Sequence, residues 1–439
     1  MESVFPSHNR LPLVARFIMI TTLLFLGLFP IGRLDGAEQD VFRSDVVTFH
    51  GDQKVSVDTL TGGSFLVTLA CKTADSAQIP SNYSIILRNV DPIEKALLLE
   101  PQLSNGGWGR FNLFRAAMIV EGVRDPKLIE TYEARLDALV ARVIADVRAS
   151  GNASPQALTR HMFETMHKEI LTKPYSIDCT ELGKVMQTGH FNCVSATVLF
   201  NVLAEKAGLD VCALEMPGHA LSMVRFSDGA TMKIETTAPT WFSLQSDKER
   251  QWATQQRIAP APALTNPPTA QNVAAVPEVL TEADLTVQHR EINPVQLVAT
   301  IYYNIGVDLH AKKRYPEAVA ANLKALFLDK KNEQAWTNLL ASLNNWALDL
   351  ASESKGSRYK EAAVILDQGV AIDPTYANFR ANQTFVFYHW IYGLAAKGRF
   401  DDARQVYASV KERRLDNENF QKLMSGIDLA EEKLAQQRQ

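Results

Sequence analysis

Three residues in the middle of the chain have the types and spacing that thiol catalysis needs. Cys193 opens a segment of helical periodicity, His219 opens a stretch of β pattern, and Glu235 lies in the next such stretch. A cysteine thiolate is a strong nucleophile, an imidazole can hold or accept its proton, and a carboxylate can orient the imidazole and stabilise its charged form. Catalysis would require the elements that carry these residues to bring the three side chains together.

The segment from Cys193 to Ala207 predicts a helix, with Asn192 as its N-cap and Gly208 as the residue that ends it. Cys193 would lie in the first turn, where unpaired backbone N–H groups and the positive dipole end favour thiolate over thiol. The backbone N–H of Cys193 would also be available to an oxyanion. Taken alone, a free cysteine is more often a small buried hydrophobic residue. Whether Cys193 is a nucleophile therefore depends on whether His219 and Glu235 can lie beside it.

The loop between two predicted strands decides whether His219 can meet Glu235. Residues 219–226 and 231–237 have strand patterns, and Ser227-Asp228-Gly229 joins them. A two-residue turn would place His219 and Glu235 on opposite faces of the sheet, because side chains alternate along a strand.

A three-residue loop with Gly229 in the left-handed region gives the alternative register. It pairs Phe226 with Ala230, Val224 with Met232 and Leu221 with Glu235. One face then holds the apolar Ala220, Val224, Phe226, Met232 and Ile234, and the other holds His219, Arg225, Lys233 and Glu235. Burial of one apolar face fixes a register, so we expect this one, with His219 diagonal to Glu235 at roughly 7–8 Å between backbones.

The order of these residues resembles the transglutaminase-like superfamily over roughly residues 105–240. The resemblance rests on the helix-opening Cys193, Ala204-Glu205-Lys206-Ala207-Gly208-Leu209, Gly218-His219-Ala220 and Glu235-Thr236-Thr237. The bacterial SirB-type branch is the most similar, and the helical residues 114–117 and 132–139 also resemble it. The resemblance implies an α+β fold with a papain-like helix on an antiparallel sheet in residues 105–245. It implies acyl transfer through a thioester, by amide-bond hydrolysis or transamidation.

Two positions depart from the family pattern. Glu235 stands where the family usually has Asp, and Leu221 stands where an aromatic residue often follows His-Ala. Many members of the SirB-type branch have lost the cysteine and have no established activity, so the presence of Cys193 argues for chemistry. The alternative is a non-catalytic protein-binding scaffold with a vestigial triad.

Residues 295–430 predict an all-α repeat domain, because a 34-residue spacing typical of tetratricopeptide repeats can be followed there. The residues at the repeat positions are Tyr302, Ile305, Gly306, Leu309, Tyr315, Ala318 and Ala325, then Trp336, Leu339, Tyr359, Ala362, Gly369 and Pro374, then Phe400, Ala403 and Tyr407. Small residues let the paired helices approach closely. Stacking of successive repeats buries apolar surface that a single repeat would leave exposed. The longer interval from Trp336 to Tyr359 would lengthen the first helix or the loop after it. Such a domain is expected to bind a protein or peptide partner in its groove; a plain helical bundle is the alternative.

The chain begins with a segment that predicts export. Residues 17–32 are uncharged and mostly apolar, which lies between a signal h-region of roughly 7–15 residues and a membrane-spanning helix of about 20. Residues 1–37 are therefore a predicted signal peptide or membrane anchor, and the protein is expected to be exported (periplasmic or extracytoplasmic) or anchored in the membrane.

Two further regions are predicted from composition. Residues 38–104 contain β-like stretches at 45–49, 64–69 and 83–87, which indicate a short β-rich region. Residues 246–294 are rich in Pro and Ala and predict a linker.

The overall composition gives no sign of a nucleic-acid, metal or cofactor partner. Hydrophobic residues make up 46% and charged residues 21%, which are ordinary globular values, and a net charge of −4 gives no reason to expect nucleic acid. The cysteine and histidine spacing matches no zinc site, so we expect no metal and no cofactor. A disulfide among Cys71, Cys179 and Cys212 is left open by the sequence.

Overall fold

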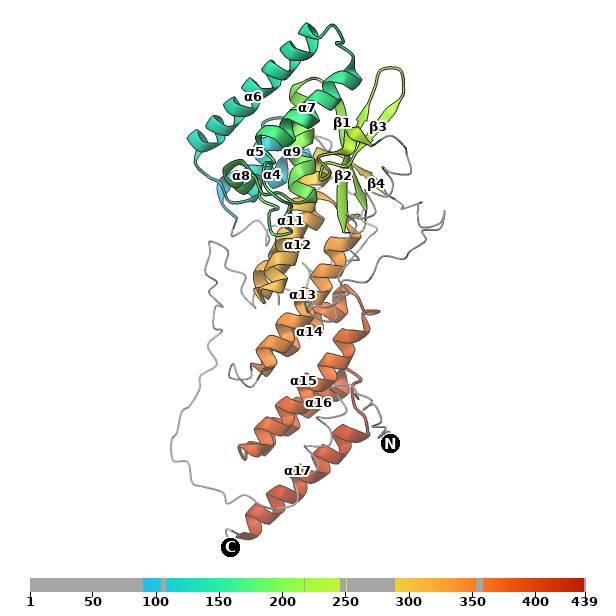
Figure 1. The fold of residues 1–439 in the computed structure, drawn as a ribbon. Helices are drawn as coiled ribbons and strands as arrows, with labels where there is room; N and C mark the ends of the chain where they lie inside the picture. Colours follow the sequence, from blue (N-terminus) through green and yellow to red (C-terminus); the bar gives the residue numbers. More distant parts are fainter. Residues whose placement is uncertain are drawn as a thin grey trace, which may run out of the picture. The chain divides into compact units, whose positions relative to one another are not determined.

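The computed structural model describes residues 90–103, 108–216, 218–244, 250, 289–352 and 358–437, which belong to one compact unit. Helices and one four-stranded antiparallel sheet make up these residues, so the predicted α+β class is confirmed (Figure 1). The apolar segment at 17–32, the strands predicted at 45–49, 64–69 and 83–87, and Cys71 lie outside the described residues. Within them, no helix has the length and apolar character needed to cross a membrane.

Among the described residues, six helices precede the sheet. They are α4 (Pro92–Leu103), α5 (Leu113–Val120), α6 (Pro126–Ala149), α7 (Pro155–Glu169), α8 (Leu182–Thr188) and α9 (Cys193–Lys206). The start of α7 has a capping residue followed by proline: Ser154 accepts a hydrogen bond from the backbone N–H of Ala157, and Pro155 occupies the first helical position. All residues of α9 except its last two are buried, as expected for a helix that is apolar on every side.

The sheet lies against α9. Its strands are β1 (Asp210–Met216), β2 (His219–Arg225), β3 (Thr231–Ile234) and β4 (Arg290–Ile292), in the order β3-β2-β1-β4 with every pair antiparallel. Helix α9 packs on β1 and β2 (Figure 1). The predicted arrangement of a helix on an antiparallel sheet is thus present in these residues.

The β2–β3 hairpin has the register predicted from its hydrophobic pattern. Val224 pairs with Met232, and the backbone N–H of Phe226 donates to the carbonyl of Ala230. Gly229 has φ +86°, in the left-handed region that a three-residue loop requires. The register therefore puts His219 and Glu235 on the same face of the sheet.

Two elements fall in regions that the sequence assigned differently. The range 38–104 was predicted to be β-rich, and its last part forms the helix α4. The range 246–294 was predicted to be a linker, and Arg290–Ile292 forms β4 on the free edge of β1. Three residues are too few for a periodic pattern, and this strand is fixed by its pairing partner and by Arg290, which contacts Glu215 in β1.

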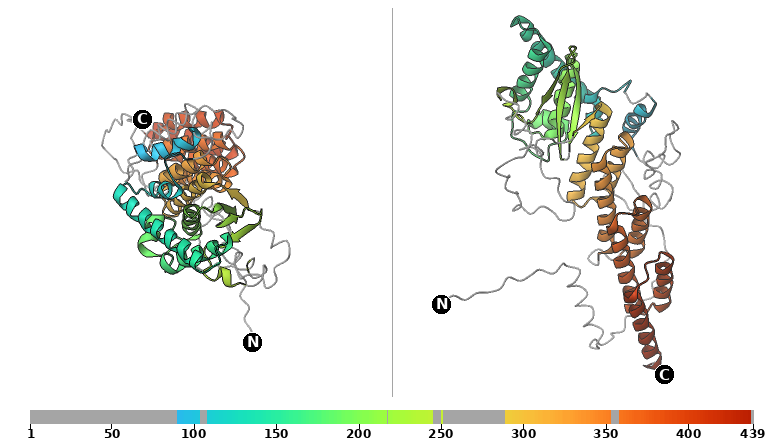
Figure 2. Two further views of the ribbon diagram at one scale, coloured as in Figure 1. Left: turned by 90° about the horizontal axis from the view of Figure 1, so that it is seen from above. Right: turned by 90° about the vertical axis from the view of Figure 1, so that its right-hand side faces the viewer.

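The C-terminal helices pack in sequence, each on the next (Figure 2). They are α11 (Pro294–Ala311), α12 (Tyr315–Leu328), α13 (Glu333–Ala351), α14 (Tyr359–Ile372), α15 (Ala377–Ala396), α16 (Phe400–Glu412) and α17 (Glu418–Gln437). Close approach at small residues is confirmed: a Cβ on Gly306 would lie 2.6 Å from the Asn322 side chain, and one on Gly369 would lie 2.5 Å from the Phe379 ring.

The first helices of this series pack on the N-terminal helices. Helix α11 contacts α5 and α9, and α12 contacts α4. At the second contact, the Lys324 ammonium lies 2.8 Å from the Glu94 carboxylate, and Tyr302 donates to the same carboxylate oxygen at 2.7 Å. All three side chains are buried, so a polar cluster lies inside this contact.

Candidate active site

Cys193 is the first residue of α9, as predicted, and the turn before it is held by a reciprocal cap. The Asn192 side chain accepts from the backbone N–H of Ser195, and the Ser195 hydroxyl accepts from the backbone N–H of Asn192, both at 3.0 Å. Because Cys193 is at the first helical position, its own N–H has no partner inside the helix, and it donates to none of the described residues.

The loop before α8 is fastened to this turn from outside. The Asn192 amide donates to the carbonyl of Ile177 at 3.0 Å and to the Thr180 hydroxyl at 2.7 Å, and the Ser195 hydroxyl donates to the carbonyl of Cys179 at 2.6 Å. These bonds are buried or partly buried, where an unmade partner is costly. The backbone around Cys193 is therefore positioned by several independent contacts.

His219 and Glu235 form a buried pair. Nε2 of His219 lies 2.7 Å from Oε2 of Glu235, and neither side chain has any solvent exposure. The other carboxylate oxygen, Oε1, accepts from the backbone N–H of Thr237 at 3.1 Å and from its hydroxyl at 2.6 Å. Both oxygens of Glu235 are thus engaged, which fixes the carboxylate against the imidazole.

The remaining nitrogen of His219 faces the thiol. Nδ1 is buried and makes no hydrogen bond within the usual limits to any described residue, and Cys193 lies near enough to act on the charge of the imidazole. Since Nε2 is taken by Glu235, Nδ1 is the atom that can exchange a proton with Cys193. The cysteine itself is 8% exposed.

The charge state of His219 follows from competing effects. Burial alone lowers the pKa of an imidazole, but the negative charge of Glu235, its hydrogen bond to Nε2 and the nearby Cys193 outweigh this effect and raise the pKa of His219 to about 10. The imidazole is therefore protonated at neutral pH. A protonated imidazole beside a thiol favours the thiolate–imidazolium ion pair.

A second layer of polar side chains supports the hairpin. The Thr197 hydroxyl donates to the carbonyl of Ala220 at 3.2 Å and accepts from the Thr236 hydroxyl at 2.9 Å. His167 donates from Nε2 to the carbonyl of Thr236 at 3.0 Å, and burial lowers the pKa of His167 to about 4, so it stays neutral. The sequence did not point to Thr197 or His167, since a threonine and a histidine inside helices carry no local signal; Thr236 was named only as part of the family motif.

The structure brings together all three side chains predicted for the site, Cys193, His219 and Glu235. Lys233 and Arg225 share their sheet face but lie toward the other end of the hairpin, where Arg225 pairs with Asp210 and Glu291. Cys179 and Cys212 are free thiols. Among the described residues, no three His, Cys, Asp or Glu side chains converge as a metal site would require.

Comparisons of the chain with protein-family models, with curated proteins and with solved structures found no match. The chemistry of the site must therefore be argued from its own geometry.

Proposed function

We propose that this chain is a thiol-dependent acyl-transfer enzyme of the transglutaminase-like type, with Cys193 as nucleophile. The observation that carries the proposal is the use of both nitrogens of His219: Nε2 is held by Glu235 at 2.7 Å, and Nδ1 is left to the thiol at a helix N-terminus. A buried structural histidine would need no such division between a carboxylate and a cysteine.

The reaction would proceed in two balanced halves. The Cys193 thiolate attacks the carbonyl carbon of an amide, a C–S bond forms, and the displaced electron pair moves to the carbonyl oxygen near the backbone N–H of Cys193. The C–N bond then breaks as the nitrogen takes the proton from Nδ1 of His219, which leaves a thioester and a free amine. In the second half, water or another amine gives a proton to His219 and displaces the thiolate.

The proposed substrate is a protein or peptide, and the two outcomes of the second half are hydrolysis and transamidation. We propose that the helical hairpins from α11 onward are tetratricopeptide-type repeats that bind a protein partner. The close approach of helices at Gly306 and Gly369 supports that proposal. The exported or membrane-anchored location stays a prediction from residues 17–32.

A second candidate function is a protein-binding scaffold with a vestigial triad. The observation that favours it is burial: the His219 and Glu235 side chains are fully covered and Cys193 is nearly so. In this candidate the pair would serve only to hold the hairpin together.

Alkylation of Cys193 by iodoacetamide as a function of pH separates the two candidates. The proposed ion pair predicts labelling at pH 6.5 about tenfold or more faster than a free thiol of pKa about 8.5 allows. His219→Ala should remove that advantage, because no cation then stabilises the thiolate. His310→Ala, a partly buried histidine in α11, is the matched control and should label like the unaltered protein. Equally slow labelling in all three proteins would favour the scaffold.

A further inference from the structure

The first C-terminal helix, α11, lies against the strand next to His219. The Thr300 hydroxyl donates to Oε1 of Glu215 in β1 at 3.2 Å. Glu215 pairs with Ala220, and the next residue of β1, Met216, pairs with His219 itself. The α11 face that carries Thr300 is therefore directed at the end of the sheet where the imidazole lies.

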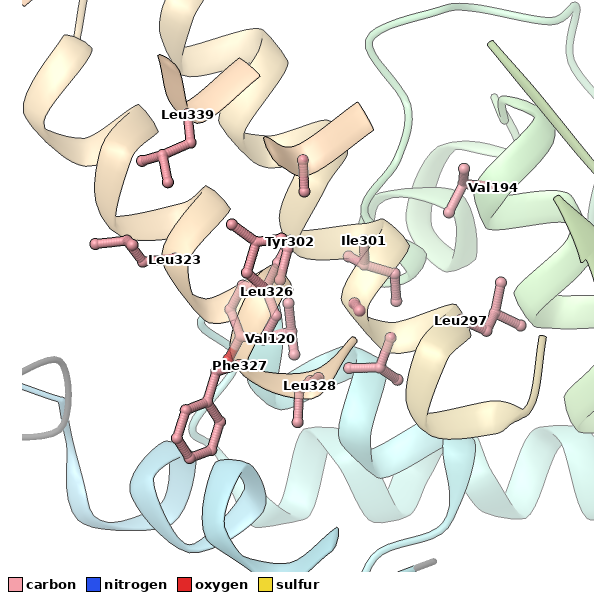
Figure 3. Close-up of a cluster of buried hydrophobic side chains, with 14 of the residues drawn as sticks. Val120, Val194, Leu297, Ile301, Tyr302, Leu323, Leu326, Phe327, Leu328 and Leu339 are labelled. Atoms are coloured by element: carbon pink, nitrogen blue, oxygen red, sulfur yellow. The ribbon is translucent and has the colours of Figure 1, made fainter. Parts of the chain in front are cut away.

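Helix α11 also packs against α9, the helix that begins with Cys193. Leu297 and Ile301 of α11 belong to one buried apolar cluster with Val194, the residue after Cys193, and α11 contacts α9 (Figure 3). Directly after the end of α11, the pKa of Lys312 is raised mainly by its bond to Asp308, and Asp178 and Glu181 are close enough for their charges to raise it further. These two acids lie in the loop that is fastened to Asn192. Helix α11 thus passes close to both elements that hold the nucleophile.

Tyr303 lies one helical turn after Thr300, on the same face of α11. Its side chain is half-buried, and its hydroxyl makes no hydrogen bond with the described residues. The charges of Glu215 and Cys193 both act on it; together with burial, which has the largest effect, they raise the pKa of Tyr303 to about 12. The phenol therefore stays protonated at neutral pH and remains a hydrogen-bond donor.

We propose that Tyr303 is a substrate-contacting residue of the Cys193 site, which donates its hydroxyl hydrogen bond to the carbonyl oxygen of the acyl group. The inference rests on the proposed acyl-transfer function and adds that the repeat segment supplies part of the catalytic site. A half-buried donor on the helix that packs against α9 and β1 can act on the charge that develops on this oxygen. The backbone N–H of Cys193 would be the second donor.

The placement of Tyr303 is tested without any substrate. In a Tyr303→Cys variant, dibromobimane should cross-link the new thiol to Cys193 and give a fluorescent product that joins the two peptides in mass spectrometry. Tyr359→Cys, a half-buried tyrosine of α14, is the matched control and should give none. Failure of the first variant to cross-link, with Cys193 still open to iodoacetamide, would overturn the placement.

The role of the hydroxyl is tested by Tyr303→Phe, which keeps the ring. With p-nitrophenyl acetate as the acyl donor, we expect the rate of Cys193 acylation to fall at least tenfold, while alkylation by iodoacetamide, which forms no oxyanion, changes less than twofold. Tyr359→Phe should alter neither rate. Unchanged acylation in Tyr303→Phe would overturn the inference. An unaltered protein that is not acylated at all would instead overturn the proposed function, and the cross-link would still decide where Tyr303 lies.

Discussion

His219 couples the electrostatics of the site to the stability of the fold. Its imidazole is fully buried, so its positive charge is tolerated only because Glu235 lies 2.7 Å away and is itself held by Thr237. Removing the carboxylate would leave a buried cation without compensation. The imidazole would then lose its proton.

The raised pKa of His219 predicts a pH-dependent stability. The folded-state value of about 10 lies above the unfolded value of about 6.5, so the contribution is complete below pH 6.5 and is lost as the pH rises toward 10. Within that window the free energy of unfolding should fall as the pH rises, by roughly 1 kcal/mol per pH unit from this group. Urea unfolding at pH 6.5, 8 and 9 measures it.

Glu235→Gln is the control for this pH dependence. It keeps the shape of the side chain and removes the charge that raises the pKa of His219, so its unfolding free energy should decline much less over the same pH range. Parallel declines in the two proteins would show that another group is responsible.

The sequence identified the three side chains of the candidate site but not the groups that hold them. Cys193, His219 and Glu235 could be predicted because a helix start and a strand register are local properties of the chain. Thr197 and His167 could not, because their partners are 39 and 69 residues away in the chain. Which of many buried polar residues meets which carbonyl depends on tertiary packing alone.

At the scale of the elements, the start of α9 holds the backbone around Cys193 in place. Asn192 caps the helix and, through its amide, also fastens the loop at Ile177 and Thr180. We predict that Asn192→Ala lowers the free energy of unfolding by at least the usual cost of a lost cap, about 1–2 kcal/mol, and slows iodoacetamide labelling of Cys193. Chemical denaturation and labelling at pH 6.5 measure the two effects.

Asn293→Ala provides a matched control for that prediction. Asn293 caps α11 with the same reciprocal arrangement, here with Gln296. Its removal should cost comparable stability and leave the Cys193 labelling rate unchanged. If both variants slowed labelling equally, the effect would reflect general loosening and not the position of the nucleophile.

The β2–β3 register and the cap of α9 could be predicted from sequence, because both are set by residues within a few positions of one another. The helix α4 and the strand β4 could not. β4 is three residues long and exists through its pairing with β1, some 75 residues earlier in the chain. A short edge strand of this kind has no periodicity of its own, and only the exposed edge of its partner specifies it.

Across the described part of the molecule, the buried Lys324–Glu94 pair ties α12 to α4. Lys324→Met would leave a buried carboxylate with only Tyr302 and the more distant Arg124, 3.4 Å away. We predict a loss near the lower end of about 3–5 kcal/mol in unfolding free energy, measured by urea titration. Adding Glu94→Leu should recover much of the loss, because the unpaired charge is then gone.

An exposed ion pair serves as the comparison. Lys422 contacts Glu418 within α17 at 2.5 Å, but the two side chains are 70% and 77% exposed. Lys422→Met should therefore change the unfolding free energy by less than about 1 kcal/mol. A similar loss in both variants would mean that burial does not distinguish the two pairs.

β4 also bears on how this protein could be divided or recombined. The strand that completes the sheet is joined by Asn293 alone to α11, so the edge strand of the candidate catalytic sheet belongs to the same chain segment as helices α11–α17. A cut between Arg250 and His289 would separate β1, β2 and β3 from β4. The first piece would lack its edge strand, and the second would lack the strand that β4 pairs with. If β4 and helices α11–α17 were exchanged as a unit, the sheet would lose its edge strand, and the edge of β1 would be left unpaired.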